Sequence, residues 1–95
     1  MNRLEHLLTI FSEECSEIQQ AVSKAKRFGL DDGYPGTERT NLSDIRIELN
    51  QLIAMAEMLE AEGLDLSPDH RVRAEKKVKV EHYLEYSKER GTLSV

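Results

Sequence analysis

The chain has 95 residues, of which 39% are hydrophobic and 33% charged, so it fits one small domain (1–95) with a modest core. Its formal net charge is −5, with six Lys/Arg against thirteen Asp/Glu in residues 1–67 and seven against five in residues 68–95. The acidic body excludes general nucleic-acid binding, a lone cysteine excludes an internal disulfide framework, and no apolar run is long enough to cross a membrane.

The first predicted element is a helix from Asn2 to about Arg27. Asn2 is typical of N-caps and has Glu5 in capping-box spacing, and Gly29 is a typical C-terminal stop. Apolar residues recur along it at helical spacing, namely Leu4, Leu7, Leu8, Phe11, Cys15, Ile18, Val22 and Ala25. This stripe predicts that Cys15 is a small core residue. Because Arg3, Glu5 and His6 interrupt the stretch that a signal peptide would need, we expect a cytoplasmic protein.

A turn-rich segment, residues 30–40, follows and contains Gly33 and Pro35-Gly36. It is longer than a tight bundle connection, and such loops are often functional. A second helix begins at Asn41 or Ser43 and ends at Gly63, with apolar residues on more than one side. We therefore expect this helix to pack against a partner subunit as well as within the chain.

A third helix begins at Ser67, with Pro68 at its first position, and runs to about Arg90. Its apolar residues are sparse and share the helix with many lysines, so one side is expected to pack while another is cationic. The expected fold is all-α, an antiparallel bundle of three main helices completed by oligomerisation. The expected assembly is a homodimer or a dimer of dimers.

Three glutamates are candidates for a metal site. Glu14 and Glu17 are three residues apart and so lie on one helix face, while Glu48 stands inside the most apolar helix. An ionised carboxylate is costly to bury unless it is paired or binds a cation. The alternatives are a solvated acidic face for the first pair, and a surface ion pair of Glu48 with Arg46 or Lys24.

The first helix ends in the cationic run Lys24-Ala25-Lys26-Arg27. Such cations can bind phosphate oxygens, or they can simply stabilise the C-terminus of the helix through its dipole.

These motifs have a specific order: Glu13-Glu14-x-x-Glu17, Lys24-x-x-Arg27-Phe28-Gly29, a Gly/Pro loop, and Glu48-Leu49-Asn50-Gln51-Leu52-Ile53-Ala54. In this order the sequence resembles the compact, phage-type branch of the MazG-like all-α nucleotide pyrophosphohydrolases, over nearly the whole chain. The resemblance implies a Mg²⁺ site, with Mn²⁺ as a substitute, and cleavage of a nucleoside triphosphate to monophosphate and pyrophosphate.

The resemblance also implies roles for particular residues. Glu14, Glu17 and Glu48 match metal ligands, and Gln51 stands at the fourth ligand position, where the family has aspartate. Glu13 and Glu17 are the candidates to orient or deprotonate the attacking water. Lys24 and Arg27 are the resemblance's candidates to hold phosphates. Lys76, Lys79 and Tyr83 are further candidates for this role, on their position and charge alone.

Two other functions remain open. Because Gln51 is neutral, the chain is alternatively a non-catalytic helical oligomer that keeps the fold, and with it nucleotide binding, after losing the fourth carboxylate. A weaker alternative is a helical module whose charged faces serve only to dock a partner, although Glu48 in an apolar helix speaks against it.

Overall fold

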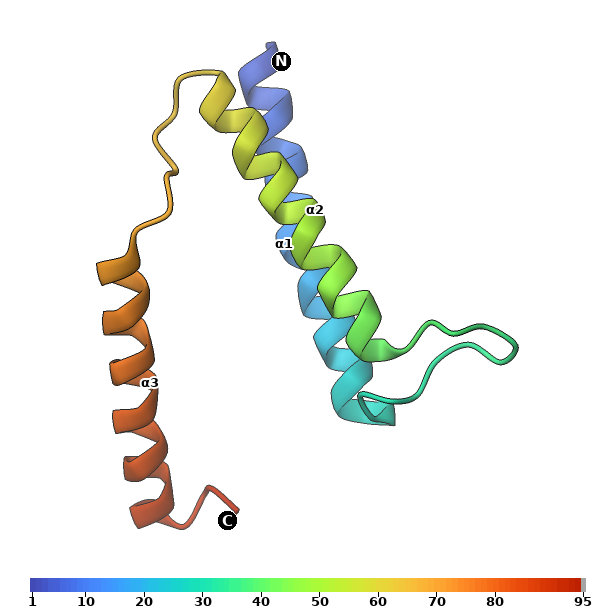
Figure 1. The fold of residues 1–95 in the computed structure, drawn as a ribbon, viewed down its shortest axis with the longest axis vertical. Coiled ribbons are helices and arrows are strands. Elements are labelled where there is room, and N and C mark those ends of the chain that lie inside the picture. Colours follow the sequence, from blue (N-terminus) through green and yellow to red (C-terminus); the bar gives the residue numbers. More distant parts are fainter. Residues whose placement is uncertain (95) are drawn as a thin grey trace.

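The computed structural model describes residues 1–94, and its fold is all-helical. Three helices follow one another: α1 (Arg3–Phe28), α2 (Asn41–Ala61) and α3 (His70–Arg90) (Figure 1). The described residues form no strand, only one isolated β-bridge between Gly33 and Thr40. The predicted all-α class and the three predicted helices are therefore confirmed.

The ends of α1 are closed as the sequence predicts. The Asn2 side chain accepts a hydrogen bond from the Glu5 amide (2.8 Å), which satisfies one free donor of the first turn. At the other end Gly29 has φ +100°, and its amide donates to the Ala25 carbonyl (2.8 Å). A residue with a side chain rarely adopts this φ, so glycine ends the helix here.

The start of α2 lies at Asn41, one of the two predicted positions. Thr40 is the N-cap, and it forms a reciprocal capping box with Ser43. The Ser43 amide donates to the Thr40 hydroxyl (3.0 Å), while the Thr40 amide donates to the Ser43 hydroxyl (2.9 Å).

The start of α3 differs from the prediction. The N-cap is Asp69, whose carboxylate accepts from the Val72 amide (3.0 Å), and not Ser67. Ser67 is engaged elsewhere, because its amide and its hydroxyl both donate to Asp65 Oδ1 (3.1 and 2.7 Å). Ser67 and Pro68 therefore belong to the linker before α3.

The helices α1 and α2 form an antiparallel hairpin, and its contact face repeats in steps of three and four residues. On α1 every residue of this repeat is buried or half-buried: Leu4, Leu7, Phe11, Glu14, Ile18, Ala21 and Ala25. The same holds on α2 for Asn41, Ile45, Glu48, Leu52, Met55 and Leu59. The core gathers around Leu7, Met55 and Leu59. Cys15 lies one residue off the repeat and is exposed, so the prediction that it is a core residue is wrong.

The loop between the helices is held at its base. The Asn41 side chain is buried and donates to the Gly29 carbonyl (2.8 Å), which ties the end of α1 to the start of α2. Gly33 pairs with Thr40 so closely that a Cβ on residue 33 would lie 1.8 Å from the Arg39 carbonyl oxygen. Only glycine fits at position 33 without movement of the backbone.

The third helix does not pack against α1 or α2 in the single chain, and none of its residues is buried (Figure 1). The radius of gyration is 17.1 Å, whereas a compact domain of this length has about 12 Å. Within one chain, only the pair α1–α2 of the expected bundle is formed. No helix in residues 1–94 combines the length and the apolar character that crossing a membrane requires.

Candidate metal centre

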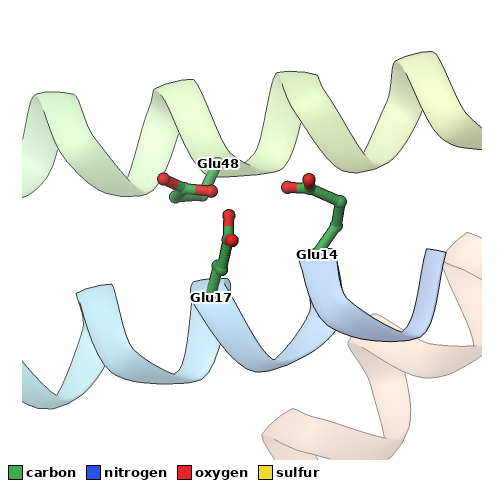
Figure 2. Close-up of side chains that lie close together, drawn as sticks. All are labelled: Glu14, Glu17 and Glu48. Atoms are coloured by element: carbon green, nitrogen blue, oxygen red, sulfur yellow. The ribbon is translucent and has the colours of Figure 1, made fainter. Parts of the chain in front are cut away.

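Three glutamates converge between the two helices of the hairpin. Glu14 and Glu17 come from successive turns of α1, and Glu48 reaches toward them from α2 (Figure 2). Each offers a carboxylate oxygen, and these oxygens all lie within 4.8 Å of one another. The contact repeat of each helix explains the meeting, because Glu14 and Glu48 occupy positions that otherwise hold core side chains.

The buried parts of this cluster lack partners. Glu14 and Glu48 are half-buried, and Oε2 of each is shielded from solvent and accepts no hydrogen bond. Glu17 is exposed and gives the cluster an opening to solvent. A buried acceptor with no donor is uncommon in a folded protein and is typical of a place where an ion or water binds.

The protonation of the cluster reflects this crowding. Hydrogen bonding with Glu17, burial, and the charges of Glu17, Glu14 and Asp44 raise the pKa of Glu48. Burial, followed by the proximity of Glu17 and Glu13, raises the pKa of Glu14. Both shifts have the same meaning: in the metal-free protein each carboxylate is held where its charged form is disfavoured.

The three glutamates form no ion pair with any cation among residues 1–94. The expected alternative of a Glu48 pair with Arg46 or Lys24 is therefore wrong. The nearby Arg39 is already engaged, since it donates two hydrogen bonds to Asp44 Oδ1 (2.7 and 3.0 Å). The other expected alternative, a solvated acidic face, fits only Glu17, because Glu14 and Glu48 each bury one carboxylate oxygen.

The donor set suits a hard divalent cation. Mg²⁺ binds oxygen ligands at about 2.0–2.1 Å, so two ligands on opposite sides of it are about 4.2 Å apart. The carboxylate oxygens of Glu14, Glu17 and Glu48 lie within 4.8 Å, which leaves only a small side-chain adjustment for a shared ion. Mg²⁺ usually keeps waters and substrate phosphates as further ligands, and the exposed side at Glu17 leaves room for them.

Two other predicted residues flank the cluster. Gln51 lies on α2, three residues after Glu48, and its exposed side chain makes no hydrogen bond with the described residues. Its amide oxygen is a neutral ligand at best. Glu13 is exposed next to Glu14, close enough to act on the Glu14 carboxyl through its charge.

Lys24 lies on a cavity of about 200 Å³ at the loop end of the hairpin. Its ammonium group is 6.0 Å from the centre of the Tyr34 ring, so the lysine and the loop face each other. Asp44 lines the same cavity and also contributes to the raised pKa of Glu48, so the cavity adjoins the acidic cluster. Sequence reasoning overlooked Tyr34 and Phe28 as lining residues. The sequence signal that could have pointed to Tyr34 is the adjacent Pro35-Gly36 turn, which marks the loop as a structured segment.

The remaining predicted cations lie elsewhere. The Arg27 guanidinium stacks on the Phe28 ring at 4.7 Å and lines a separate depression on the surface of α1. Lys76, Lys79 and Tyr83 share one face of α3. Because α3 contacts neither α1 nor α2, these three residues are not brought to the glutamates within one chain.

Comparisons with models of known protein families, with curated proteins and with solved structures each gave no match. The activity of the chain must therefore be inferred from the chemistry of its own residues. Its most specific feature is a set of three converging carboxylates, two of which bury an unpaired oxygen.

Proposed function

We propose that the chain is a Mg²⁺-dependent nucleoside triphosphate pyrophosphohydrolase, which converts an NTP or dNTP to the monophosphate and pyrophosphate. The observation that carries the proposal is the convergence of Glu14, Glu17 and Glu48 with two buried, unpaired oxygens. A cation explains why three like charges are held together in the centre of a small hairpin. The order of the motifs, which resembles the MazG-like enzymes, supplies the reaction.

The proposed mechanism divides the work among the residues of the hairpin. Mg²⁺, when bound, would supply charge neutralisation for the phosphate oxygens and activation of a water. Glu14 and Glu48 would hold the ion from the buried side. Glu17, the exposed member, orients or deprotonates the water, with Glu13 as the second candidate for this step. Lys24 is placed on the adjoining cavity to contact phosphate oxygens.

The proposed enzyme is an oligomer, a homodimer or a dimer of dimers in which the three-helix bundle is completed between chains. Large apolar side chains remain exposed on α2, including Leu49 and Ile53, and α3 has no packing partner in its own chain. Because α3 contacts neither helix of its own hairpin, Lys76, Lys79 and Tyr83 stay outside the proposed site of their own chain. Mn²⁺ is expected to substitute for Mg²⁺, because both prefer oxygen ligands in octahedral geometry.

The second candidate is a non-catalytic oligomer that keeps nucleotide binding. One observation favours it: Gln51 is exposed and neutral, so the site has three carboxylates and not four. The two candidates agree on the fold and on ion binding, and they differ only in turnover.

The test is pyrophosphate release from a panel of ribo- and deoxyribonucleoside triphosphates, with Mg²⁺, with Mn²⁺ and with a chelator. We expect release that depends on the metal, is lost in Glu48→Gln and persists in Glu5→Gln, which removes an exposed carboxylate of α1 outside the cluster. Metal binding without release over the whole panel would favour the non-catalytic oligomer. Neither binding nor release would refute the proposed site.

A further inference from the structure

The helix α3 is a well-formed helix without a partner. Asp69 caps its start and Gly91, with φ +78°, ends it, yet no residue between them is buried. Most helical stability in proteins comes from packing one face of the helix, and not from helix propensity alone. Something outside the single chain therefore covers α3.

The amount of surface indicates how large the missing contact is. The single chain exposes 7950 Å², whereas a compact monomer of 10.9 kDa exposes about 5,600 Å². The excess is about 2,400 Å² per chain, so two chains that remove it would bury a total near the upper part of the range for obligate homodimers, about 2,000–5,000 Å². A transient encounter would leave most of this surface exposed.

The linker holds α3 away from its own hairpin. At the end of α2 the amides of Gly63 and Leu64 donate to the carbonyls of Glu60 and Leu59 (2.9 and 3.2 Å), an arrangement that closes the helix and turns the chain. The turn at Asp65 and Ser67 and the Asp69 cap follow directly. Local hydrogen bonds support these steps, and α3 then diverges from the hairpin, so that only its first turn lines a groove with α2 (Figure 1).

The outer side of α2 offers a complementary surface. A second stripe, one residue out of phase with the contact repeat, carries Leu42, Leu49, Ile53 and Ala56, and the three large side chains are exposed. A groove of about 460 Å³ lies between this end of α2 and the chain's own linker and first turn of α3. Ile53, Ala56, Glu57 and Glu60 line its α2 side, and the other side is lined by Leu66, Ser67, Pro68, Asp69, Val72 and Arg73. The α2 side of the groove is an apolar strip with an acidic edge.

The face of α3 that carries Val80, Tyr83 and Leu84 has the opposite charge. Lys76 and Lys79 line the same shallow depression of about 230 Å³. Over the whole helix seven Lys/Arg stand against four Asp/Glu, whereas residues 1–67 hold six against thirteen. Two hairpins would repel each other, whereas a hairpin and an α3 attract each other.

We propose that two copies of this chain exchange their third helices, so that α3 of each copy packs with its Val80–Tyr83–Leu84 face on the outer stripe of α2 in the other copy. In this arrangement one apolar strip faces the other, and the basic edge of α3 meets Glu57 and Glu60. The exchange concerns the assembly alone and holds whether or not the chain is an enzyme.

The first test measures the charge complementarity by sedimentation. The unmodified protein is expected to be a dimer at micromolar concentration, and its dimer Kd should rise with NaCl. Lys76→Glu/Lys79→Glu should raise the Kd by about tenfold or more, because it places like charges against the acidic edge. The matched control Arg71→Glu/Lys88→Glu makes the same change in charge outside the depression, and it should leave the Kd nearly unchanged. Equal effects of the two double variants, or a monomeric unmodified chain, would overturn the proposal.

The second test separates exchange from fold-back and does not depend on charge. In a Cys15→Ser background, Ile53→Cys/Val80→Cys and Leu49→Cys/Leu84→Cys are treated with a short bis-maleimide and separated on a denaturing gel. Exchange predicts a covalent species of twice the 10.9 kDa chain mass from at least one pair. Ile53→Cys/Val78→Cys, with the second cysteine at the most exposed valine of α3, should remain unlinked. A product of single-chain mass with both thiols consumed would mean that α3 folds back on α2 of its own chain. A covalent dimer of the single variant Ile53→Cys would mean that α2 of one chain contacts α2 of the other. No cross-link from either pair would mean that α3 does not contact α2 at these residues. Each of these results overturns the exchange.

Discussion

Replacing Glu48 by glutamine removes one of three negative charges while keeping the shape of the side chain. The carboxylate oxygens of the cluster lie within 4.8 Å of one another, less than the screening length of about 8 Å at physiological ionic strength. Salt therefore does not remove their repulsion. The new amide can also donate a hydrogen bond to the unpaired oxygen of Glu14. We expect the metal-free variant to be as stable as the unmodified protein or more stable.

Mg²⁺ should reverse this order of stability between the unmodified protein and Glu48→Gln. An ion that binds only the folded state stabilises it by RT ln(1 + [L]/Kd), which is about 1.4 kcal/mol at ten times the Kd. For a domain of this size, that free energy corresponds to a rise of roughly 6–11 °C in the melting midpoint. The unmodified protein should show this rise on addition of Mg²⁺, and Glu48→Gln should lose most of it.

The assay is a pair of thermal scans by circular dichroism, with EDTA and with Mg²⁺, at one fixed protein concentration because oligomer stability depends on concentration. Glu5→Gln is the control and should keep the full rise, since its carboxylate lies outside the cluster. If Glu48→Gln melted several degrees lower without metal and still responded fully to Mg²⁺, Glu48 would be a structural residue and the reasoning would be refuted.

Three further predictions follow from the same geometry. The pKa of Glu48 is raised above its ordinary 4.5, so folding favours the protonated form. The stabilising contribution of this group to the metal-free protein is therefore complete below pH 4.5 and is lost as the pH rises through the raised pKa. The melting midpoint of the unmodified protein, relative to that of Glu48→Gln, should decrease over this pH window. Gln51→Asp adds a negative charge near the ion, so the Mg²⁺ concentration for half-maximal turnover should fall, with tenfold corresponding to about 1.4 kcal/mol; an unchanged Mg²⁺ requirement would place Gln51 outside the site. In urea denaturation Gly33→Ala should destabilise more than Gly36→Ala. A Cβ at residue 33 would meet the Arg39 carbonyl oxygen at 1.8 Å, whereas at Gly36 the space is open and only the φ of +79° opposes a side chain. Equal losses would contradict the tight loop.

Local signals were sufficient for the ends of α1. Asn2 and Gly29 act through hydrogen bonds and backbone angles within a few residues, so their roles can be read without knowledge of the fold. The same reasoning failed at α3, where both Ser67 and Asp69 are suitable caps. Which of them is used depends on Asp65, which accepts both hydrogen bonds of Ser67 and leaves Asp69 free to cap.

The phase of the contact face explains the error at Cys15. The residues Phe11, Cys15 and Ile18 fit a helix face when α1 is considered alone. Paired helices instead use steps that average 3.5 residues, which selects Phe11, Glu14 and Ile18. In this repeat Glu14 places a carboxylate at a core position, which is the feature of the sequence that indicates a site. Glu48 occupies the equivalent kind of position in the repeat of α2.

Neither repeat alone determines that the two carboxylates meet, because this depends on how the helices are paired along their length. In an antiparallel hairpin the pairing is set where the chain turns, and here Asn41 binds the Gly29 carbonyl while Gly33 pairs with Thr40. A relative displacement of the two helices by one residue corresponds to about 1.5 Å along the axis. A shift of two residues would therefore move Glu48 by about 3 Å, enough to take it out of reach of a shared ion. The loop thus serves the site even where it touches no ligand, since its tight base sets the register that brings the glutamates together.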